Sequence, residues 1–255
     1  MTTVLETDGL TKRFGELTAV DDVTLSIGDE GVTSIIGPNG AGKTTFYNLL
    51  TGVLEPTAGT IHLREEGELV EITDAPPHEV ARRGLSRSYQ ITNVFEGLTV
   101  RENLQVARIS HDGRTMDLRS RAASDEAINE EVDRLLELMG LTEMADRPCD
   151  ALSHGEKRSV EIALALAIEP TVFLLDEPTA GMNATEAREI VSLVKQLDEE
   201  LAATFVVTEH NMDVVRDVSD RIVVLADGAV LADGEPEAVL TDERVTEAYL
   251  GSEAA

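Results

Sequence analysis

The sequence predicts an α/β fold: a mixed sheet with an antiparallel β part at its N-terminus, and a helical subdomain inserted in the middle. Three observations support this prediction. Short apolar or alternating runs separated by Gly and Asp dominate the first part of the chain. The middle part carries the 3.6-residue periodicity of helices instead. Near-continuous apolar runs alternating with helices follow after residue 168, as expected for buried central strands.

The N-terminal part is expected to be rich in strands. The expected strands are Val4 to Glu6, Val23 to Ile27, Val32 to Ile36, Thr60 to Leu63 and Glu68 to Ile72. A helix is expected from Lys43 to about Thr51. A short helix is expected from Pro77 to Arg83, because proline suits the first turn of a helix.

Residues 91–168 are expected to form the helical subdomain of a single 255-residue domain. Thr99 to Ala107 and Glu126 to Met139 have helical spacing, and in the second of these helices one face carries Val132, Leu135, Leu136 and Met139. The polar stretch Ser110 to Ser124 between them indicates an exposed loop.

The remaining residues, 169–255, are expected to join residues 1–90 in one core. Buried strands are expected at Val172 to Leu175, Thr204 to Val207 and Arg221 to Leu225, with connecting helices at Ala184 to Glu200 and Asn211 to Val218. Asp227-Gly228 is a strong hairpin-turn signal. Short helices at Pro236 to Leu240 and Arg244 to Leu250 are expected to close the chain.

The charge is unusual: the chain has 49 acidic and 21 basic residues, for a formal net charge of −28. A basic partner would explain this charge. We favour a hydrated acidic surface suited to a very salty cytosol, because the acidic residues are spread along the chain. Nucleic acid is not an expected partner, since no basic stripe is present to neutralise phosphates.

The chain is expected to be soluble and to remain in the cytosol. No apolar stretch approaches the roughly 18 residues that a membrane helix needs, and the N-terminus lacks the basic and apolar regions of a signal peptide. The one cysteine, Cys149, is expected to be structural and fits a reducing compartment.

One stretch matches the phosphate-loop pattern in full, between an apolar strand and a helix. Its backbone N–H groups are expected to surround the phosphates of a nucleotide, Lys43 to reach the β and γ oxygens, and Thr44 to offer a hydroxyl to Mg²⁺. The predicted nucleotide-binding residues here are Gly37, Pro38, Asn39, Gly40, Ala41, Gly42, Lys43, Thr44 and Thr45.

A second half of a catalytic centre is expected at the end of the strand Val172 to Leu175. Asp176 at its end can hold Mg²⁺ through water, and Glu177 beside it can orient or deprotonate an attacking water molecule. A strand that ends in Asp-Glu is common, so the motif alone could arise by chance. The phosphate loop upstream makes the interpretation as a catalytic centre the better one.

The run Leu152-Ser153-His154-Gly155-Glu156 has the features of a second phosphate site: a serine cap, a glycine for close backbone approach, and the free N–H groups of a helix start. The chain already has one such site. The simplest explanation is a head-to-tail pair of subunits, in which each subunit covers the nucleotide of the other.

With these motifs, nearly the whole chain resembles the ATP-binding subunit of an ABC transporter, which implies a P-loop NTPase core and ATP and Mg²⁺ as cofactors. The run at Leu152 resembles the signature motif of that family, with His154 where Gly and Glu156 where Gln is usual. The resemblance implies that Ser153 and Gly155 contact the γ-phosphate held by the opposite subunit. A carboxylate at Glu156 would be unfavourable there unless it faces away.

The other family positions follow in the expected order. Gln90 resembles the glutamine that reaches Mg²⁺ and the attacking water, and His210 resembles the switch histidine at the γ-phosphate. Ala180-Gly181-Met182-Asn183 resembles the D-loop, with Asn183 where Asp is commoner. Phe14 lies where the family places an aromatic ring that stacks on adenine. The resemblance thus implies Glu177, His210 and Gln90 as catalytic residues, and Thr44, Gln90 and Asp176 at the metal.

Finer details resemble the ATPases of branched-chain amino-acid importers, and within that group the G-type. They are the stretches His78 to Gln90 and Leu98 to Leu104, the D-loop, and the ending Ala248-Tyr249-Leu250-Gly251. Urea and amide importers share these details, and lipopolysaccharide-export ATPases are related. A soluble ATPase acting on DNA or the ribosome fits less well, because the long coiled-coil insertion and the tandem domains of those classes are missing from the sequence.

The resemblance also implies partners and a location. The expected partners are a second ATPase subunit, identical or similar, two transmembrane permease subunits, and indirectly an external solute-binding protein. The chain would act on the cytoplasmic side, peripheral to the cell membrane, with the permease contact near Gln90 and Ile91 to Leu104.

Overall fold

The computed structural model of the chain describes residues 2–88, 94–111 and 125–252. The strands form two sheets, and this confirms the predicted α/β class with its antiparallel part. The four-stranded sheet is antiparallel, in the order β2-β1-β4-β5. Its strands are β1 (Thr3–Phe14), β2 (Leu17–Gly28), β4 (Ala58–Glu65) and β5 (Glu68–Glu71).

The six-stranded sheet has the order β10-β9-β3-β8-β7-β6. It is parallel except for β10, which forms a hairpin with β9 across the predicted Asp227-Gly228 turn. Its strands are β3 (Thr33–Ile36), β6 (Leu85–Ser88), β7 (Val172–Asp176), β8 (Thr204–Thr208), β9 (Arg221–Ala226) and β10 (Ala229–Gly234).

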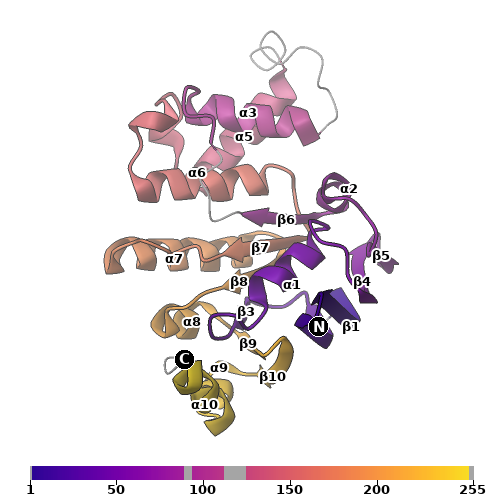
Figure 1. Ribbon diagram of the computed structural model, residues 1–255. Coiled ribbons are helices and arrows are strands. Elements are labelled where there is room, and N and C mark those ends of the chain that lie inside the picture. Colours follow the sequence, from indigo (N-terminus) through magenta and orange to yellow (C-terminus); the bar gives the residue numbers. More distant parts are fainter. Residues whose placement is uncertain (1, 89–93, 112–124, 253–255) are drawn as a thin grey trace.

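Helices pack around the sheets and lie at both ends of the molecule (Figure 1). Figure 1 shows α3, α5 and α6 together at the top of the view, and α8, α9 and α10 at the opposite end. The helices are α1 (Lys43–Leu50), α2 (Pro77–Arg82), α3 (Val100–His111), α5 (Glu126–Leu138), α6 (His154–Leu166), α7 (Ala184–Glu200), α8 (Met212–Val218), α9 (Pro236–Leu240) and α10 (Glu243–Ser252). Among the described residues, no helix is both long and apolar enough to cross a membrane.

Strand β7 contributes to two hydrophobic clusters at once. Successive side chains of a strand point to opposite faces of the sheet. Phe173 and Leu175 therefore pack against the helices α3, α5, α6 and α7, whereas Val172 and Leu174 pack with α1 and the antiparallel sheet. All four side chains are fully buried. The position of Asp176 at the end of β7 is thus fixed from both faces of the sheet.

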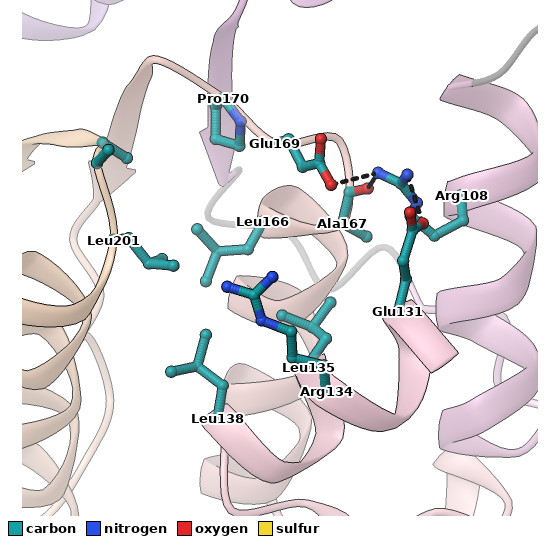
Figure 2. A pocket seen from close by; sticks show the side chains of 12 residues that line it. Arg108, Glu131, Arg134, Leu135, Leu138, Leu166, Ala167, Glu169, Pro170 and Leu201 are labelled. Carbon is teal, nitrogen blue, oxygen red and sulfur yellow. Dashed lines mark hydrogen bonds and ion pairs between the residues drawn. The ribbon is translucent and has the colours of Figure 1, made fainter. Parts of the chain in front are cut away.

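Buried Arg108 links the helices at the top of Figure 1. Its guanidinium lies 2.5 Å from Glu131 of α5 and 3.3 Å from Glu169, and donates a 2.9 Å hydrogen bond to the Ala167 carbonyl. Figure 2 shows these contacts at the edge of a cavity of about 280 Å³, where Arg134 points among leucine side chains. Arg108 therefore ties α3 to α5 and to the segment that leads into β7.

Several element bounds differ from the predictions, and one strand was not predicted. Strand β1 runs to Phe14 instead of ending at Glu6, because β-bulges let it pair with both β2 and β4 past Gly9. The sequence did not predict β6, whose four residues pair with β7. Ser110 and His111 lie in α3 instead of an exposed loop; the rest of that stretch, residues 112–124, lies outside the described residues. Cys149 is buried, as expected of a structural residue, and burial raises the pKa of its thiol.

Candidate active site

The phosphate-loop sequence forms the turn between β3 and α1. Gly42 has a φ of +97°, and a Cβ atom there would lie 2.2 Å from the carbonyl oxygen of Ala19. Only glycine fits such a position, because it has neither the backbone restriction nor the side chain. The amino group of Lys43 donates hydrogen bonds to the carbonyls of Gly37 at 2.5 Å and Pro38 at 3.0 Å. Burial lowers the pKa of Lys43, against the opposing effects of Glu177 and Asp176.

The loop forms one wall of a cavity of about 370 Å³. Most of the sequence-predicted residues meet there, from four separate parts of the chain. The lining residues are Phe14, Leu17, Ala19, Asn39, Gly40, Ala41, Gly42, Lys43, Thr44, Thr45, Asp176, Glu177, Thr208 and His210. Parallel strands bring their carboxyl ends to one edge of a sheet, so the loop after β3 and the acidic pair after β7 lie together.

Asp176 is held on both carboxylate oxygens. Thr208, at the end of β8, donates a hydrogen bond of 2.7 Å to Oδ1. Arg87 of β6 forms an ion pair with Oδ2 at 2.5 Å. The carboxylate thus has a fixed orientation at the rim of the cavity.

Glu177 follows in a left-handed backbone conformation, with a φ of +45°. Such a conformation is costly for a residue with a side chain and persists only where the surrounding structure holds it, as at many active sites. The backbone N–H of Glu177 donates a 3.0 Å hydrogen bond to the Thr208 carbonyl. Its carboxylate lies 2.7 Å from Nε2 of His210. The base and the histidine named from the sequence are therefore direct neighbours.

Phe14 lines the same cavity. Its side chain is 47% exposed, although large apolar side chains are usually buried. The ammonium of Lys12 lies 5.3 Å from the centre of the ring. An exposed aromatic face beside a phosphate loop is suited to stacking on a planar base.

Ser153 and Gly155 do not meet the phosphate loop within the chain. They line a different cavity, of about 320 Å³, together with residues of α7. Ser153 caps α6: its hydroxyl accepts from the Glu156 N–H at 3.3 Å, and the Glu156 carboxylate accepts from the Ser153 N–H at 2.6 Å. Arg147 binds the other oxygen of Glu156 at 3.0 Å.

The Glu156 carboxylate, which was expected to be unfavourable beside a phosphate, therefore accepts hydrogen bonds from the Ser153 N–H at the start of α6 and from Arg147. The hydrogen bond from the Ser153 N–H lowers the pKa of Glu156, and Arg147 adds to this effect. Asn183, in the place of the usual Asp, forms a second capping box with Glu186 at the start of α7.

Gln90 and the start of the stretch from Ile91 lie outside the described residues. The sequence reasoning also missed contributors to the site. Thr208 and Arg87 both hold Asp176, and buried Glu209 accepts two hydrogen bonds from Thr179. One sequence signal could have identified such residues: a charged or hydroxyl residue at the end of an apolar strand, such as Thr208 at the end of Thr204–Thr208.

The residues present fit Mg²⁺ together with a nucleotide. Thr44 and Asp176 offer hard oxygen donors at the same cavity. In the part of the chain that the structure describes, no three His, Cys, Asp or Glu side chains gather as a metal cluster. Mg²⁺ is usually held by one or two carboxylates plus phosphate oxygens and water, which matches a site with few protein ligands.

Comparisons with known proteins agree with this geometry. The family model described as ABC transporter matches residues 20–180, and the model described as branched-chain amino acid ATP-binding cassette transporter matches residues 229–255. The chain is 42% identical to the high-affinity branched-chain amino acid transport ATP-binding protein BraF of Pseudomonas aeruginosa. That similarity covers 97% of this chain and 98% of the relative.

Solved structures are similar over nearly the same length. The ADP conformation of MJ1267, an ATP-binding cassette of an ABC transporter, matches with a TM-score of 0.84 and 32% identity, over 98% of this chain and 100% of that one. A dimeric post-hydrolysis state of the ATP-binding cassette MJ0796, bound to ADP and Pi, matches with a TM-score of 0.73 and 28% identity. It covers 91% of this chain and 98% of the other.

Proposed function

This chain belongs to the ABC transporter family of ATPases, and from that premise we propose that it powers the uptake of branched-chain amino acids through a membrane importer. As a member of this family it hydrolyses ATP. The observation that carries the substrate class is the full-length similarity to a branched-chain amino acid transport protein, supported by the match of residues 229–255 to the model specific to that group.

Within the proposed cycle, the residues around the 370 Å³ cavity divide the work. Lys43 and backbone N–H groups of the loop 37–45 other than Pro38 bind the phosphates, and Phe14 supports the base. Thr44, Asp176 and Gln90 hold Mg²⁺, which supplies positive charge to the phosphate oxygens. Glu177 orients or deprotonates the attacking water, and His210, 2.7 Å from it, holds that carboxylate in place.

The second phosphate site belongs to a partner subunit in this proposal. Ser153 and Gly155 line a cavity separate from the phosphate loop of their own chain, so a head-to-tail pair gives each of them a nucleotide to contact. The dimeric state of a related cassette supports such a pair. Residues 1–90 and 169–255 would act as the nucleotide-binding core, and residues 91–168 as the helical subdomain that moves against it.

The proposed location is the cytoplasmic face of the cell membrane, on two permease subunits. The experiment is reconstitution of the chain with its co-purifying subunits in vesicles, with candidate binding proteins and solutes added in turn. We expect leucine, isoleucine or valine with a matching binding protein to stimulate ATP hydrolysis. Stimulation by urea or short amides alone, or co-purification with a lipid-export complex, would overturn the substrate class.

A further inference from the structure

Arg87 is a buried cation next to the proposed metal ligand. Its side chain is 4% exposed, and one of its terminal nitrogens lies 2.5 Å from Oδ2 of Asp176. Another donates a 2.7 Å hydrogen bond to Oδ1 of Asn48, in the helix that follows the phosphate loop. The guanidinium also lies 5.3 Å from the ring centre of Tyr47. Arg87 thereby connects α1, β6 and β7 at the back of the active site.

These contacts leave little of the Asp176 carboxylate unengaged. Oδ2 faces Arg87 and Oδ1 accepts from Thr208 at 2.7 Å. A carboxylate oxygen has two lone pairs, so each oxygen keeps one position for a further donor or for a water on a metal. The charge of Asp176 is nevertheless offset by a guanidinium in direct contact.

The two carboxylates at the proposed metal position are each opposed by a nearby positive charge. Asp176 and Glu177 are negative, and Lys43 lines the same cavity as both. Arg87 supplies the second positive charge. A third cation, Arg158, donates a 2.9 Å hydrogen bond to the Asp176 carbonyl, and its charge is offset by Glu161 at 2.9 Å. Buried Glu209 is a further carboxylate nearby, and it accepts two hydrogen bonds from Thr179. With Asp176 and Glu177 opposed by Arg87 and Lys43, a free divalent cation gains less attraction than two unopposed carboxylates would give it, although the chain as a whole carries −28. A nucleotide triphosphate adds several negative charges and reverses this balance.

We propose that Arg87 is a positioning residue that makes divalent-metal binding at Asp176 depend on the nucleotide, so that the metal enters with ATP and not before it. This inference rests on the proposed role of Asp176 in ATP hydrolysis and adds an order of binding to it. A purely structural ion pair would contribute to folding, often with little net effect on stability, and would leave the preference for metal unchanged.

The test titrates the isolated subunit with Mn²⁺ as the probe and follows free Mn²⁺ by its electron paramagnetic resonance signal, without nucleotide and in molar KCl, which screens the acidic surface. The variants are R87M, R87Q and R87K. R83M is the matched control, because Arg83 pairs with Glu65 at a partly exposed site away from the cavity. Circular dichroism checks the fold of each variant.

We expect wild type and R83M to bind Mn²⁺ equally weakly in the absence of nucleotide. R87M and R87Q should gain one site at least about tenfold tighter, because removal of one charge at close range leaves a carboxylate uncompensated. The added site should disappear in R87M with D176N. R87K, which keeps the charge, should resemble wild type. With ATP present, wild type should bind Mn²⁺ tightly.

Two results would overturn the proposal. One is Mn²⁺ affinity in folded R87M or R87Q equal to that of R83M. The other needs no Arg87 variant: a tight nucleotide-free Mn²⁺ site in wild type that D176N removes. The titration uses neither permease nor solute. An importer that ignores branched-chain amino acids would therefore refute the proposed substrate and leave this result intact.

Discussion

Glu177 combines an unfavourable backbone conformation with a direct contact to His210. Its φ of +45° is held by the bond from its N–H to the Thr208 carbonyl, which the end of β8 provides. The fixed backbone and the 2.7 Å contact with His210 together restrict where the carboxylate can lie. The geometry is what a fixed base requires, because proton transfer depends on alignment before it depends on pKa.

Replacement of Glu177 by Gln should lower the rate of ATP hydrolysis at least about hundredfold, because the amide cannot take a proton from water. Nucleotide binding should persist, since the phosphate loop is unchanged. Steady-state hydrolysis and size-exclusion chromatography with ATP check this, and we expect an ATP-bound dimer in the variant. A variant with full activity would remove Glu177 from the proposed role.

Replacement of Glu156 by Ala should lower the free energy of unfolding by about 1 kcal/mol at neutral pH, because the capping box loses its carboxylate. The pKa of Glu156 is lowered in the fold, so its contribution is present above the ordinary glutamate pKa and is lost as the pH falls through the lowered value. Urea unfolding at several pH values measures the difference.

Glu137→Ala is the matched control for that experiment, because Glu137 is exposed and its side chain has no hydrogen bond or ion pair within the described residues. It should be close to wild type throughout. A difference between Glu156→Ala and wild type that does not shrink toward pH 3 would contradict the assigned capping role.

At the level of elements, Arg108 shows how a single side chain joins helices that are distant in sequence. It binds Glu131, Glu169 and the Ala167 carbonyl (Figure 2). The two glutamates are exposed, so water can hydrogen-bond to their carboxylates when the arginine is removed. The carbonyl bond is buried and has no such replacement.

Arg108→Met should therefore destabilise the chain by about 1–2 kcal/mol. Arg134→Met, in the same cavity, should have little effect, because Arg134 is exposed and has no ion pair or hydrogen bond among the described residues. Thermal unfolding of the two variants side by side tests this. Equal losses in both would show that the cavity lining matters more than the Arg108 contacts.

The elements that sequence patterns predicted best are those whose signals are local. Helix α7 begins and ends at the predicted residues, because Asn183 and Glu186 form a capping box at its start. The hairpin at Asp227-Gly228 was equally clear. Strand β6 was missed because its four residues, Leu85–Ser88, show no apolar run; pairing with β7, far away in sequence, makes them a strand.

The site residues likewise divide into those with a local sequence signal and those that depend on long-range contacts. The phosphate loop and the Asp176-Glu177 pair are contiguous motifs, and the structure brings them to one cavity. Thr208 and Arg87 became visible only in three dimensions, since their importance comes from contacts with Asp176 across neighbouring strands. A single sequence carries no sign of such cross-strand pairs.

At the level of the whole molecule, the net charge of −28 sets the conditions under which the fold is stable. Carboxylates spread over a surface repel one another, and salt reduces this repulsion by shortening the screening length to about 3 Å at 1 M. We therefore expect the urea concentration at the unfolding midpoint to be measurably higher in 3 M KCl than in 0.1 M KCl.

The control is a neutral sugar at matched osmotic strength, which changes hydration without screening charge. Salt should stabilise more than sugar does. A midpoint that is insensitive to KCl would contradict the interpretation of the acidic surface as an adaptation to salt, and would make a basic partner the better explanation of the charge.

The strand order of the six-stranded sheet has a consequence for synthesis. Strand β3, which leads into the phosphate loop, pairs only with β8 and β9, and β8 begins at Thr204. A growing chain therefore carries its phosphate loop through most of translation before either neighbouring strand has left the ribosome. Such long-range pairing is slow and leaves apolar strands unpaired. The nascent chain should need chaperone protection until its last fifth emerges, and a ribosome stalled before Thr204 should display a loop unable to retain nucleotide.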